Sequence, residues 1–360
     1  MANSTLAPTT GNVDAFNLKS IETGGVIHED VMDKIFDISR IPLPFTDMVG
    51  KTSHKNERFD WVLDELNPPM LNNQRVDGQD AGDLVSITGG RVGNHSQISD
   101  KVIAVSYRAD SSDTIGRAKE LAYRLTRANQ EIRRDVEAAA LFNQASQAGT
   151  DAVVGITGGL PTWIETSVFN ADGSEGTAGG YNYTSGLTTE ATAGAAAPVS
   201  FKCIKDAIQS VYEEGGEVSV LMSTPSVITG ISTYMFNETA RIATLQADQG
   251  KSTDKAKALA SVNVIVSDFG TVKLVPNRLQ PGNGDVDATT GLVTSTSDNI
   301  FLLDPEYVSL SYLEGYRTDT LAKTGLAEKR QISVDWGLRV HTEKAHAMIT
   351  GVDGSKEAVE

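Results

Sequence analysis

The longest feature with a single periodicity is residues 114–147, which contain no proline and one glycine, close to their start. Small and apolar side chains recur there at alternating spacings of three and four, which places them on one stripe of an α-helix. A helix of that length would span roughly 50 Å at about 1.5 Å per residue. The members of the stripe are Ile115, Ala118, Ala122, Leu125, Asn129, Ile132, Val136 and Ala139.

The flanks and the charges of this stretch also favour a helix. Ser112 or Asp113 is suited to cap its start and Gly149 to end it. An ordinary core helix with one solvated face is the favoured interpretation. The more specific hypothesis is a structural spine across an elongated molecule. A coiled coil is disfavoured because Asn129 interrupts the seam. Oppositely charged pairs four residues apart, which support the solvated face, are Glu120 with Arg124, Arg127 with Glu131, and Arg133 with Glu137.

Net charge and cysteine content exclude several classes of protein. The chain has 360 residues and a net charge of −16. That charge disfavours a sequence-reading nucleic-acid binder, because phosphate neutralisation supplies most of such a protein's affinity. The single cysteine, Cys203, excludes an internal disulfide framework and a cysteine-rich zinc site. No apolar run approaches the roughly 18 residues of a membrane span, and the first residues lack the pattern of a secretory signal.

The first fifty residues are predicted to have no core of their own. Residues 1–28 are polar and indicate an extended arm. Residues 28–39 form a short amphipathic pattern that Pro42 and Pro44 end. Such a segment is expected to lie on another surface.

Residues 51–110 indicate two long strands around a loose tip. Residues 58–63 alternate, with Phe59 and Trp61 on the same face, and residues 101–108 are predicted as the return strand. Prolines and glycines between them predict a tip that buries little apolar area. An isolated hairpin of this kind is marginal in water, so we expect it to lie on a neighbouring subunit.

The second half of the chain mixes helices and strands in an α+β order. Residues 149–198 are rich in Gly, Ala and Thr and predict an irregular surface loop anchored by Leu160, Trp163 and Ile164. Residues 331–341 alternate cleanly, which predicts a half-buried antiparallel strand. The other predicted elements are helices at 201–213 and from Thr224-Pro225, a strand at 218–222, a hairpin at 262–275, a turn at 282–285, and strands at 300–303 and 307–313.

One set of motifs resembles serine hydrolases of the penicillin-binding type. Ser252-Thr-Asp-Lys255, Ser297-Asp-Asn299 and Lys323-Thr-Gly325 occur in the order of those enzymes, in which the serine is the nucleophile. The context does not fit, because the interval between the first two motifs holds a predicted hairpin where a helical domain is required. This enzyme therefore remains only a weak alternative.

The other candidate motifs also lack the neighbouring residues that their chemistry would need. Asp268-Phe-Gly270 lacks a catalytic loop and a phosphate loop beside it. Residues 170–176 could attract calcium, but the glycine is out of EF-hand register and a plain turn is favoured. Among the histidines only His341 and His346 come close to a ligand spacing; they are five residues apart and fall on opposite faces if the strand continues, which disfavours a metal site. We therefore predict no catalytic, cofactor-binding or metal-binding residues, no cofactor and no enzymatic activity. A mobile arm, a long hairpin and a spine helix instead indicate a subunit of an assembly.

The order of these elements resembles the major capsid (major head) proteins of tailed bacteriophages with the Hong Kong 97 fold, in a podovirus-like branch. Phe59-Asp-Trp61 and Thr224-Pro225 fit that family. The residues that carry most of the resemblance are 299–305 (NIFLLDP), 313–317 (LEGYR), 321–332 (LAKTGLAEKRQI) and 336–346 (WGLRVHTEKAH).

The resemblance implies a domain division and a set of partners. The implied function is a structural protein that self-assembles into an icosahedral virion shell around double-stranded DNA, in the host cytoplasm. Implied partners are other copies in hexamers and pentamers, a separate scaffolding protein, the portal, a decoration protein and non-specifically contacted DNA, with no membrane. An encapsulin-like compartment is the alternative. The implied divisions are an N-terminal arm (1–50), an E-loop (51–110), a P-domain with the spine helix and a Gly/Ala-rich insertion (111–198), an A-domain (199–318), and a return to the P-domain (319–360).

Overall fold

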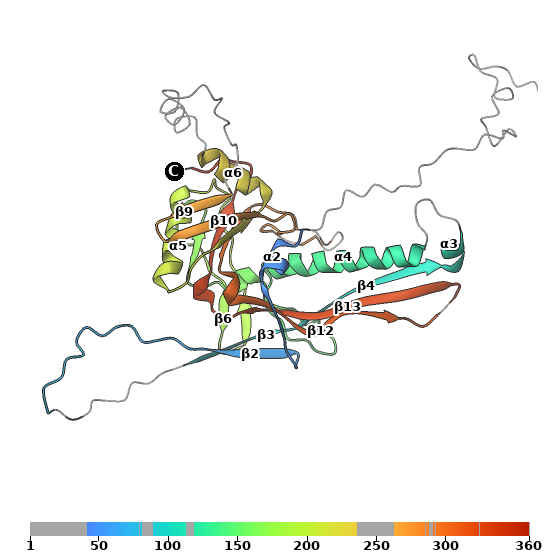
Figure 1. The fold of residues 1–360 in the computed structure, drawn as a ribbon, viewed down its shortest axis with the longest axis horizontal. Helices are drawn as coiled ribbons and strands as arrows, with labels where there is room; N and C mark the ends of the chain where they lie inside the picture. The colour runs from blue at the N-terminus through green and yellow to red at the C-terminus, as the bar shows by residue number, and fades with distance from the viewer. Residues whose placement is uncertain are drawn as a thin grey trace, which may run out of the picture.

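The computed structural model describes residues 42–78, 80, 89–112, 119–235, 263–284, 286–287, 291, 293–323 and 325–359. The arm predicted at 1–28 and the helix predicted at 28–39 lie outside these residues. Within them, the molecule is elongated, with a helix-and-sheet body at one end and a long sheet with its helix at the other (Figure 1).

A six-stranded sheet forms the centre of the body, in the order β5-β14-β11-β8-β10-β9. Both of its faces are covered: Leu221 and Leu302 pack under helices α5 and α6, whereas Met222 and Phe301 face the second core. Burial on both faces explains why its central strands are continuous apolar runs. The elements are β5 (Val168–Asn170), β8 (Val220–Ser223), β9 (Val264–Ser267), β10 (Gly270–Pro276), β11 (Asp298–Leu303), β14 (Ala347–Val352), α5 (Phe201–Glu213) and α6 (Pro225–Met235).

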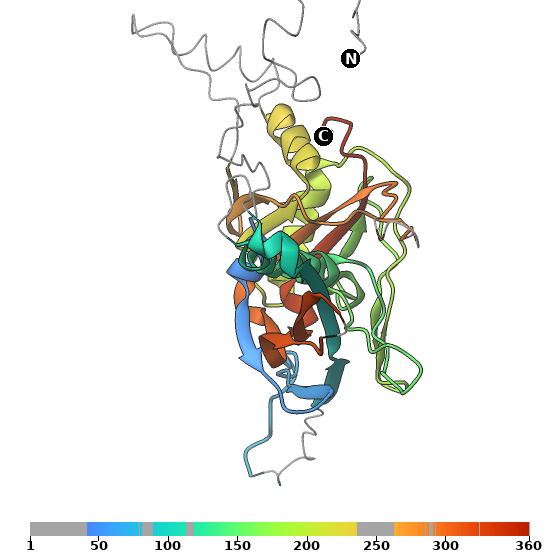
Figure 2. The ribbon, with the colours of Figure 1, turned by 90° about the vertical axis from the view of Figure 1, so that its right-hand side faces the viewer.

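The long sheet has four strands in the order β1-β12-β13-β4. On β13, Val334, Trp336 and Leu338 are buried, so the predicted alternation of residues 331–341 is confirmed. Helix α4 lies along this sheet, against β4 and β13. The helix is seen end-on in Figure 2. The elements are β1 (Gly50–Ser53), β4 (Gln97–Ser106), β12 (Val308–Thr320), β13 (Ala327–Val340), α2 (Pro44–Met48), α3 (Tyr107–Ser111), α4 (Glu120–Leu141), η2 (Pro305–Tyr307) and η3 (Glu343–Ala345).

Helix α4 is shorter than its sequence pattern predicts. The described helix begins at Glu120 and ends at Leu141, not near Gly149; residues 113–118 lie outside the described part. The chain leaves the helix because Asn143 is held elsewhere: its side-chain amide donates to the Ala191 carbonyl at 2.7 Å, and its oxygen accepts from the Ala191 N–H at 3.1 Å. Long-range hydrogen bonds therefore override local helix propensity.

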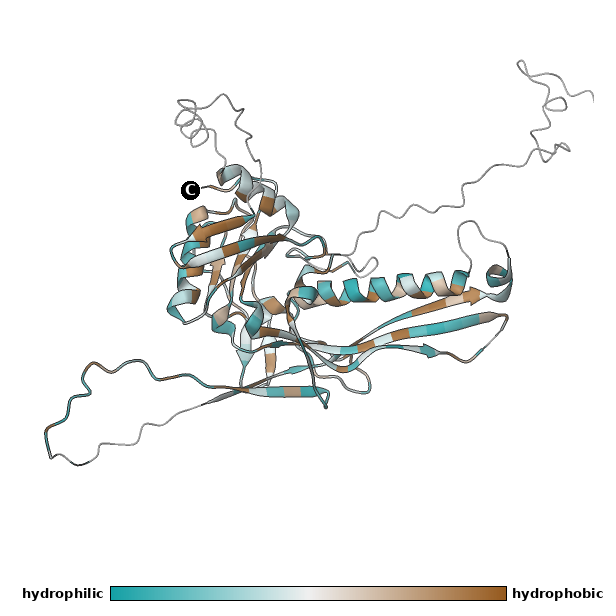
Figure 3. Ribbon diagram, viewed as in Figure 1, coloured by the Kyte–Doolittle hydropathy of each residue, from teal (hydrophilic) through white to brown (hydrophobic). Residues whose placement is uncertain are grey.

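The buried stripe of α4 is also rotated from the predicted one. Ile132 and Val136 are buried as predicted, but Ala122 is exposed, and Ala128 and Ala140 are buried in its place. The ion pair of Glu120 with Arg124 forms at 2.8 Å. Polar and apolar positions alternate along the helix in Figure 3.

The hairpin pairing predicted from sequence is wrong. Residues 58–63 form β2 (Arg58–Leu63), but their partner is β3 (Gly90–His95), and β4 pairs with β13 instead. The glycines of β3 had indicated a tip. Gly93 is needed opposite Asp60, because a Cβ there would lie within the van der Waals radius of the Asp60 carboxylate. That carboxylate accepts from Arg58 at 3.0 Å and from Arg91 at 2.9 Å.

Residues 149–198 are more ordered than a surface loop. Leu160, Trp163 and Ile164 are buried, as predicted, but β5 belongs to the central sheet, where it pairs with β14. The Gly- and Thr-rich composition hid these strands because their partners lie far away in sequence. The remaining elements of this segment are η1 (Leu160–Thr162), β6 (Gly180–Asn182) and β7 (Leu187–Thr189).

Candidate functional site: the root of the projecting hairpin

A hairpin projects from the body, formed by β2, β3 and the described residues between them, 64–78, 80 and 89; we call it the projecting hairpin (Figure 1). Among residues 64–78 and 80 no helix or strand forms. Large apolar side chains nevertheless gather there: Leu66 is 98% exposed and Leu71 92%, and Met70 and Val76 are also exposed. Concentrated exposed apolar groups mark an interaction surface.

The root of the projecting hairpin rests on β13 through Phe59. The Phe59 ring lies against Gly337, where an added Cβ would be 2.5 Å from the ring edge. The Arg339 guanidinium stacks over Phe59 at 5.4 Å and over Trp61 at 5.7 Å from the ring centroids. Burial lowers the pKa of Arg339. This cation–π arrangement fixes the direction in which β2 leaves the sheet.

Asn94 fastens the other strand of the root. Its side-chain amide is fully buried and donates to the Leu338 carbonyl at 2.7 Å and to the Thr157 hydroxyl at 3.0 Å. Its oxygen accepts from the Gly158 N–H at 2.9 Å. One side chain thus joins β3, β13 and the segment before η1, so the root is rigid although the hairpin beyond it is extended.

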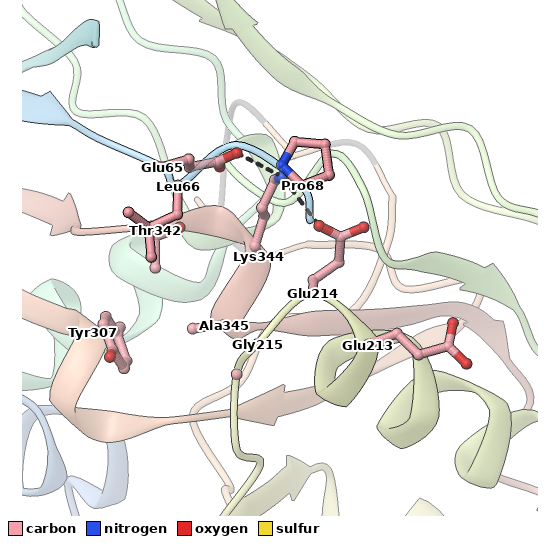
Figure 4. A pocket seen from close by; sticks show the side chains of 11 residues that line it. Glu65, Leu66, Pro68, Glu213, Glu214, Gly215, Tyr307, Thr342, Lys344 and Ala345 are labelled. Carbon is pink, nitrogen blue, oxygen red and sulfur yellow. Dashed lines mark hydrogen bonds and ion pairs between the residues drawn. The ribbon is translucent and has the colours of Figure 1, made fainter. Parts of the chain in front are cut away.

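An acidic cavity of about 530 Å³ lies where the projecting hairpin leaves the body. Figure 4 shows Lys344 between Glu65 of the hairpin and Glu214 at the end of α5. The Lys344 ammonium is 3.1 Å from the Glu65 carboxylate and 3.0 Å from that of Glu214. These two carboxylates raise the pKa of Lys344. These two ion pairs, which we call the clasp, connect the projecting hairpin to the body that contains the six-stranded sheet.

A smaller cavity of about 150 Å³ adjoins the clasp and has aromatic walls. We call it the aromatic cavity. Trp163 and Tyr181 are nearly parallel, with centroids 5.7 Å apart, and Tyr183 meets Tyr181 edge-on at 5.2 Å. Burial raises the pKa of the Tyr183 phenol, and the charge of Glu165 raises it further. The cavity is therefore aromatic and electronegative.

Glu137 of α4 is a buried junction between three parts of the chain. Its carboxylate is fully buried and accepts from the backbone N–H groups of Phe45 at 2.8 Å and Thr46 at 2.7 Å. It also accepts from the Asn277 side-chain amide at 2.9 Å. The predicted ion pair with Arg133 is wrong, since Arg133 stacks on the Tyr316 ring.

His346 is fully buried beside the clasp, next to η3, and its Nε2 has no hydrogen-bond partner among the described residues. Burial lowers the pKa of His346 from 6.5 to about 4. Because the folded-state pKa of His346 is lower than its unfolded value, its contribution to the free energy of unfolding is highest above pH 6.5. It decreases as pH falls from 6.5 towards 4, because in that range only the unfolded chain binds the proton.

We therefore expect the free energy of unfolding to fall by roughly 3 kcal/mol between pH 6.5 and 4 on account of His346. Urea unfolding at a series of pH values measures this slope. The variant His346→Asn lacks the titrating group and is expected to show a flatter profile. An unchanged slope in that variant would assign the acid sensitivity to other groups.

The catalytic motifs weighed from sequence do not come together. Ser297 precedes β11 of the six-stranded sheet, whereas Lys323 lies in the β12–β13 turn of the other sheet; residues 252–255 are outside the described part. Burial raises the pKa of Cys203 to about 12, which leaves its thiol unreactive. The Asp172 carboxylate accepts two hydrogen bonds from Ser174, as in a plain turn.

No group of three potential metal ligands occurs in the part of the chain that the structure describes. Among those same residues, no helix has the length and apolar character needed to cross a bilayer. Sequence reasoning missed Asn94, Glu137 and Arg339, because a polar residue in an alternating or helical pattern gives no sign that it is buried.

The same fold occurs in solved shell structures. A chain from Gordonia phage Cozz gives a TM-score of 0.56 at 13% identity, covering 98% of both chains. The capsid of a native GTA particle gives 0.54 at 13% identity, over 92% of this chain and 97% of that one. The SrpI encapsulin of Synechococcus elongatus PCC 7942 gives 0.53 at 10% identity, over 95% and 98%. The fold is therefore that of the Hong Kong 97-like capsid proteins.

Sequence comparison then separates the phage class from the encapsulins. A model of the SU10 major capsid protein family matches residues 8–353. The major capsid protein of Escherichia phage Phieco32 is 26% identical over 352 residues, which covers 88% of this chain and 91% of that protein. The chain belongs to the SU10 major capsid protein family. The predicted class, a phage major capsid protein that forms the capsid shell, is thereby confirmed, and the podovirus-like branch stays a prediction.

Proposed function

We propose that copies of this chain assemble through their projecting hairpins into the hexamers and pentamers of an icosahedral phage head. The observation that carries this proposal is the run of exposed apolar side chains, Leu66, Met70, Leu71 and Val76, on the part of the projecting hairpin that forms no helix or strand. Burying Leu66 and Leu71 on neighbours would contribute about 1.5–3 kcal/mol for each side chain. Many such contacts in one shell add by avidity.

The proposal extends to the domain division and the partners. We assign the N-terminal arm to residues 1–50, the P-domain to 111–198 and 319–360, and the A-domain to 199–318. Pairing of β4 with β13 supports an E-loop narrower than 51–110, confined to the projecting hairpin. A separate scaffolding protein guides assembly in the host cytoplasm, and a portal, a decoration protein and non-specifically bound double-stranded DNA complete the head.

Assembly is tested by expressing the chain alone and with a candidate scaffolding protein, and measuring mass by light scattering and negative-stain imaging. The wild type is expected to form megadalton shells. The double variant Leu66→Asp with Leu71→Asp is expected to remain as 38.3 kDa subunits or single capsomers, because charge on both side chains opposes their burial.

Val266→Asp is the matched control, since Val266 is also exposed but lies on β9 of the body. It is expected to assemble. Equal loss in both variants would remove the special role of the projecting hairpin, and a wild-type chain that stays monomeric under both conditions would overturn the proposed assembly. Shells that contain a protein cargo and exclude DNA would favour the encapsulin-like alternative.

A further inference from the structure

We propose that the aromatic cavity receives the guanidinium group of Arg75 from a second copy of this chain. The inference rests on the proposed function, because it names the surface on which a neighbour's projecting hairpin docks. The contact would join the extended part of one hairpin to the root of the next.

The shape of the aromatic cavity suits one planar cation. Trp163 and Tyr181 stack on each other at an interplanar angle of 10°, and Tyr183 stands at 89° to Tyr181, so the rings form an aromatic corner. Aromatic faces in this arrangement attract arginine and lysine head groups through their quadrupoles. The volume of about 150 Å³ is below the roughly 300–1,000 Å³ of a small-molecule pocket. It therefore fits a side-chain head better than a folded segment.

The charges around the aromatic cavity favour a cation over any other occupant. Glu65, Glu165 and Glu343 line it, with Lys344 as the one cation among its lining residues. Lys344 is already held by Glu65 and Glu214. The Glu165 carboxylate accepts no hydrogen bond and forms no ion pair with any described residue, and its side of the cavity is open because Tyr183 is 66% exposed. One carboxylate thus remains available for an incoming guanidinium group.

Arg75 is the basic side chain that the projecting hairpin offers beyond its two strands, in which Arg58 and Arg91 are paired with Asp60. Between Leu63 and Gly90 the sequence contains acidic residues and this single arginine. Arg75 is exposed and makes no hydrogen bond or ion pair with the described residues. The hairpin extends away from its own root (Figure 1), and Arg75 is absent from the lining of the aromatic cavity. A neighbouring copy is therefore the acceptor.

Such a contact is heterologous, since a hairpin on one copy meets a root on another. Contacts of this kind close into rings when the rotation between copies is right. Bidentate pairing of Arg75 with Glu165 would also fix the angle between neighbours, which a purely apolar contact leaves loose.

The first test compares two variants that change the hairpin charge equally. Arg75→Gln removes the guanidinium group, whereas Gln74→Glu adds one negative charge beside it and leaves Arg75 in place. The fraction of chain in shells is measured by sedimentation at a series of subunit concentrations. Arg75→Gln is expected to need a roughly tenfold higher concentration for assembly, and Gln74→Glu less than a twofold change.

The second test addresses the cavity. Tyr183→Ala removes one wall and is expected to impair assembly as Arg75→Gln does, whereas Tyr183→Phe keeps the ring and is expected to assemble. A charge swap then tests the pairing directly: Arg75→Glu and Glu165→Arg each impair assembly alone, and the double variant is expected to recover at least part of it. Circular dichroism of each subunit confirms that it folds.

The outcomes separate this inference from the proposed function. Normal assembly of Arg75→Gln or Tyr183→Ala would overturn the docking of Arg75 while leaving the shell function intact. Failure of the charge-swapped pair to recover beyond the single variants would also count against it. Failure of the wild type to assemble would overturn the proposed function and the docking together.

Discussion

Replacing Glu137 by alanine is expected to lower the free energy of unfolding of the subunit by about 3–5 kcal/mol. The carboxylate is fully buried, and its removal leaves the backbone N–H groups of Phe45 and Thr46 without acceptors. The side-chain amide of Asn277 loses its carboxylate acceptor as well and keeps only the Met222 sulfur at 3.5 Å. Each unsatisfied buried donor costs about 1–3 kcal/mol. Urea unfolding followed by circular dichroism measures the change.

The matched control is Glu131→Ala, on the same helix but exposed. It is expected to change stability by less than about 0.5 kcal/mol. Glu137→Gln keeps the size of the side chain but places an NH₂ group against donors, so we expect it to be nearly as destabilising as alanine. A Glu137→Ala subunit as stable as the wild type would show that water or a shift of α2 satisfies these donors.

Replacing Gly337 by alanine is expected to destabilise the root of the projecting hairpin by about 1–3 kcal/mol. The new Cβ would lie 2.5 Å and 2.6 Å from two ring carbons of Phe59. The ring cannot easily yield, because it is buried, stacks on His54 at 4.4 Å, and carries the Arg339 guanidinium on its face. Tryptophan fluorescence, to which Trp61 contributes, and urea unfolding report the displacement.

Gly315→Ala on β12 is the control, because nothing lies within 4 Å of its added Cβ. We expect it to leave stability and fluorescence nearly unchanged. If both alanine variants change stability and fluorescence equally, the contact of the Phe59 ring with Gly337 makes no specific contribution to the stability of the root. A loosened root would also be expected to reduce shell assembly, which links this substitution to the proposed function.

The sequence predicted those parts of the fold in which local pattern and environment agree. The alternation of β13 and the helix at 201–213 are short-range signals, and both are confirmed. The hairpin 262–275 forms as β9 and β10 around Asp268-Phe-Gly270, with Val262 outside the described residues. In these elements, the side chains that the periodicity places on the inner face contact the core or the partner strand.

The predictions were wrong where contacts between residues far apart in the sequence determine the structure. The end of α4 depends on Asn143 bonding to Ala191, and the partner of β2 depends on Gly93 accommodating Asp60. Neither contact leaves a trace in local propensity. The root itself was half predicted: Phe59 and Trp61 were placed on one face, but the Arg339 guanidinium that covers them has no sequence signal.

The position of β14 has a consequence for the order of events during synthesis. This strand lies inside the six-stranded sheet, between β5 and β11, although it is the last described strand to leave the ribosome. Until it arrives, both neighbours present open edges. The six-stranded sheet therefore cannot be completed until residues 347–352 have emerged, although β8, β9, β10 and β11 can pair with one another before then.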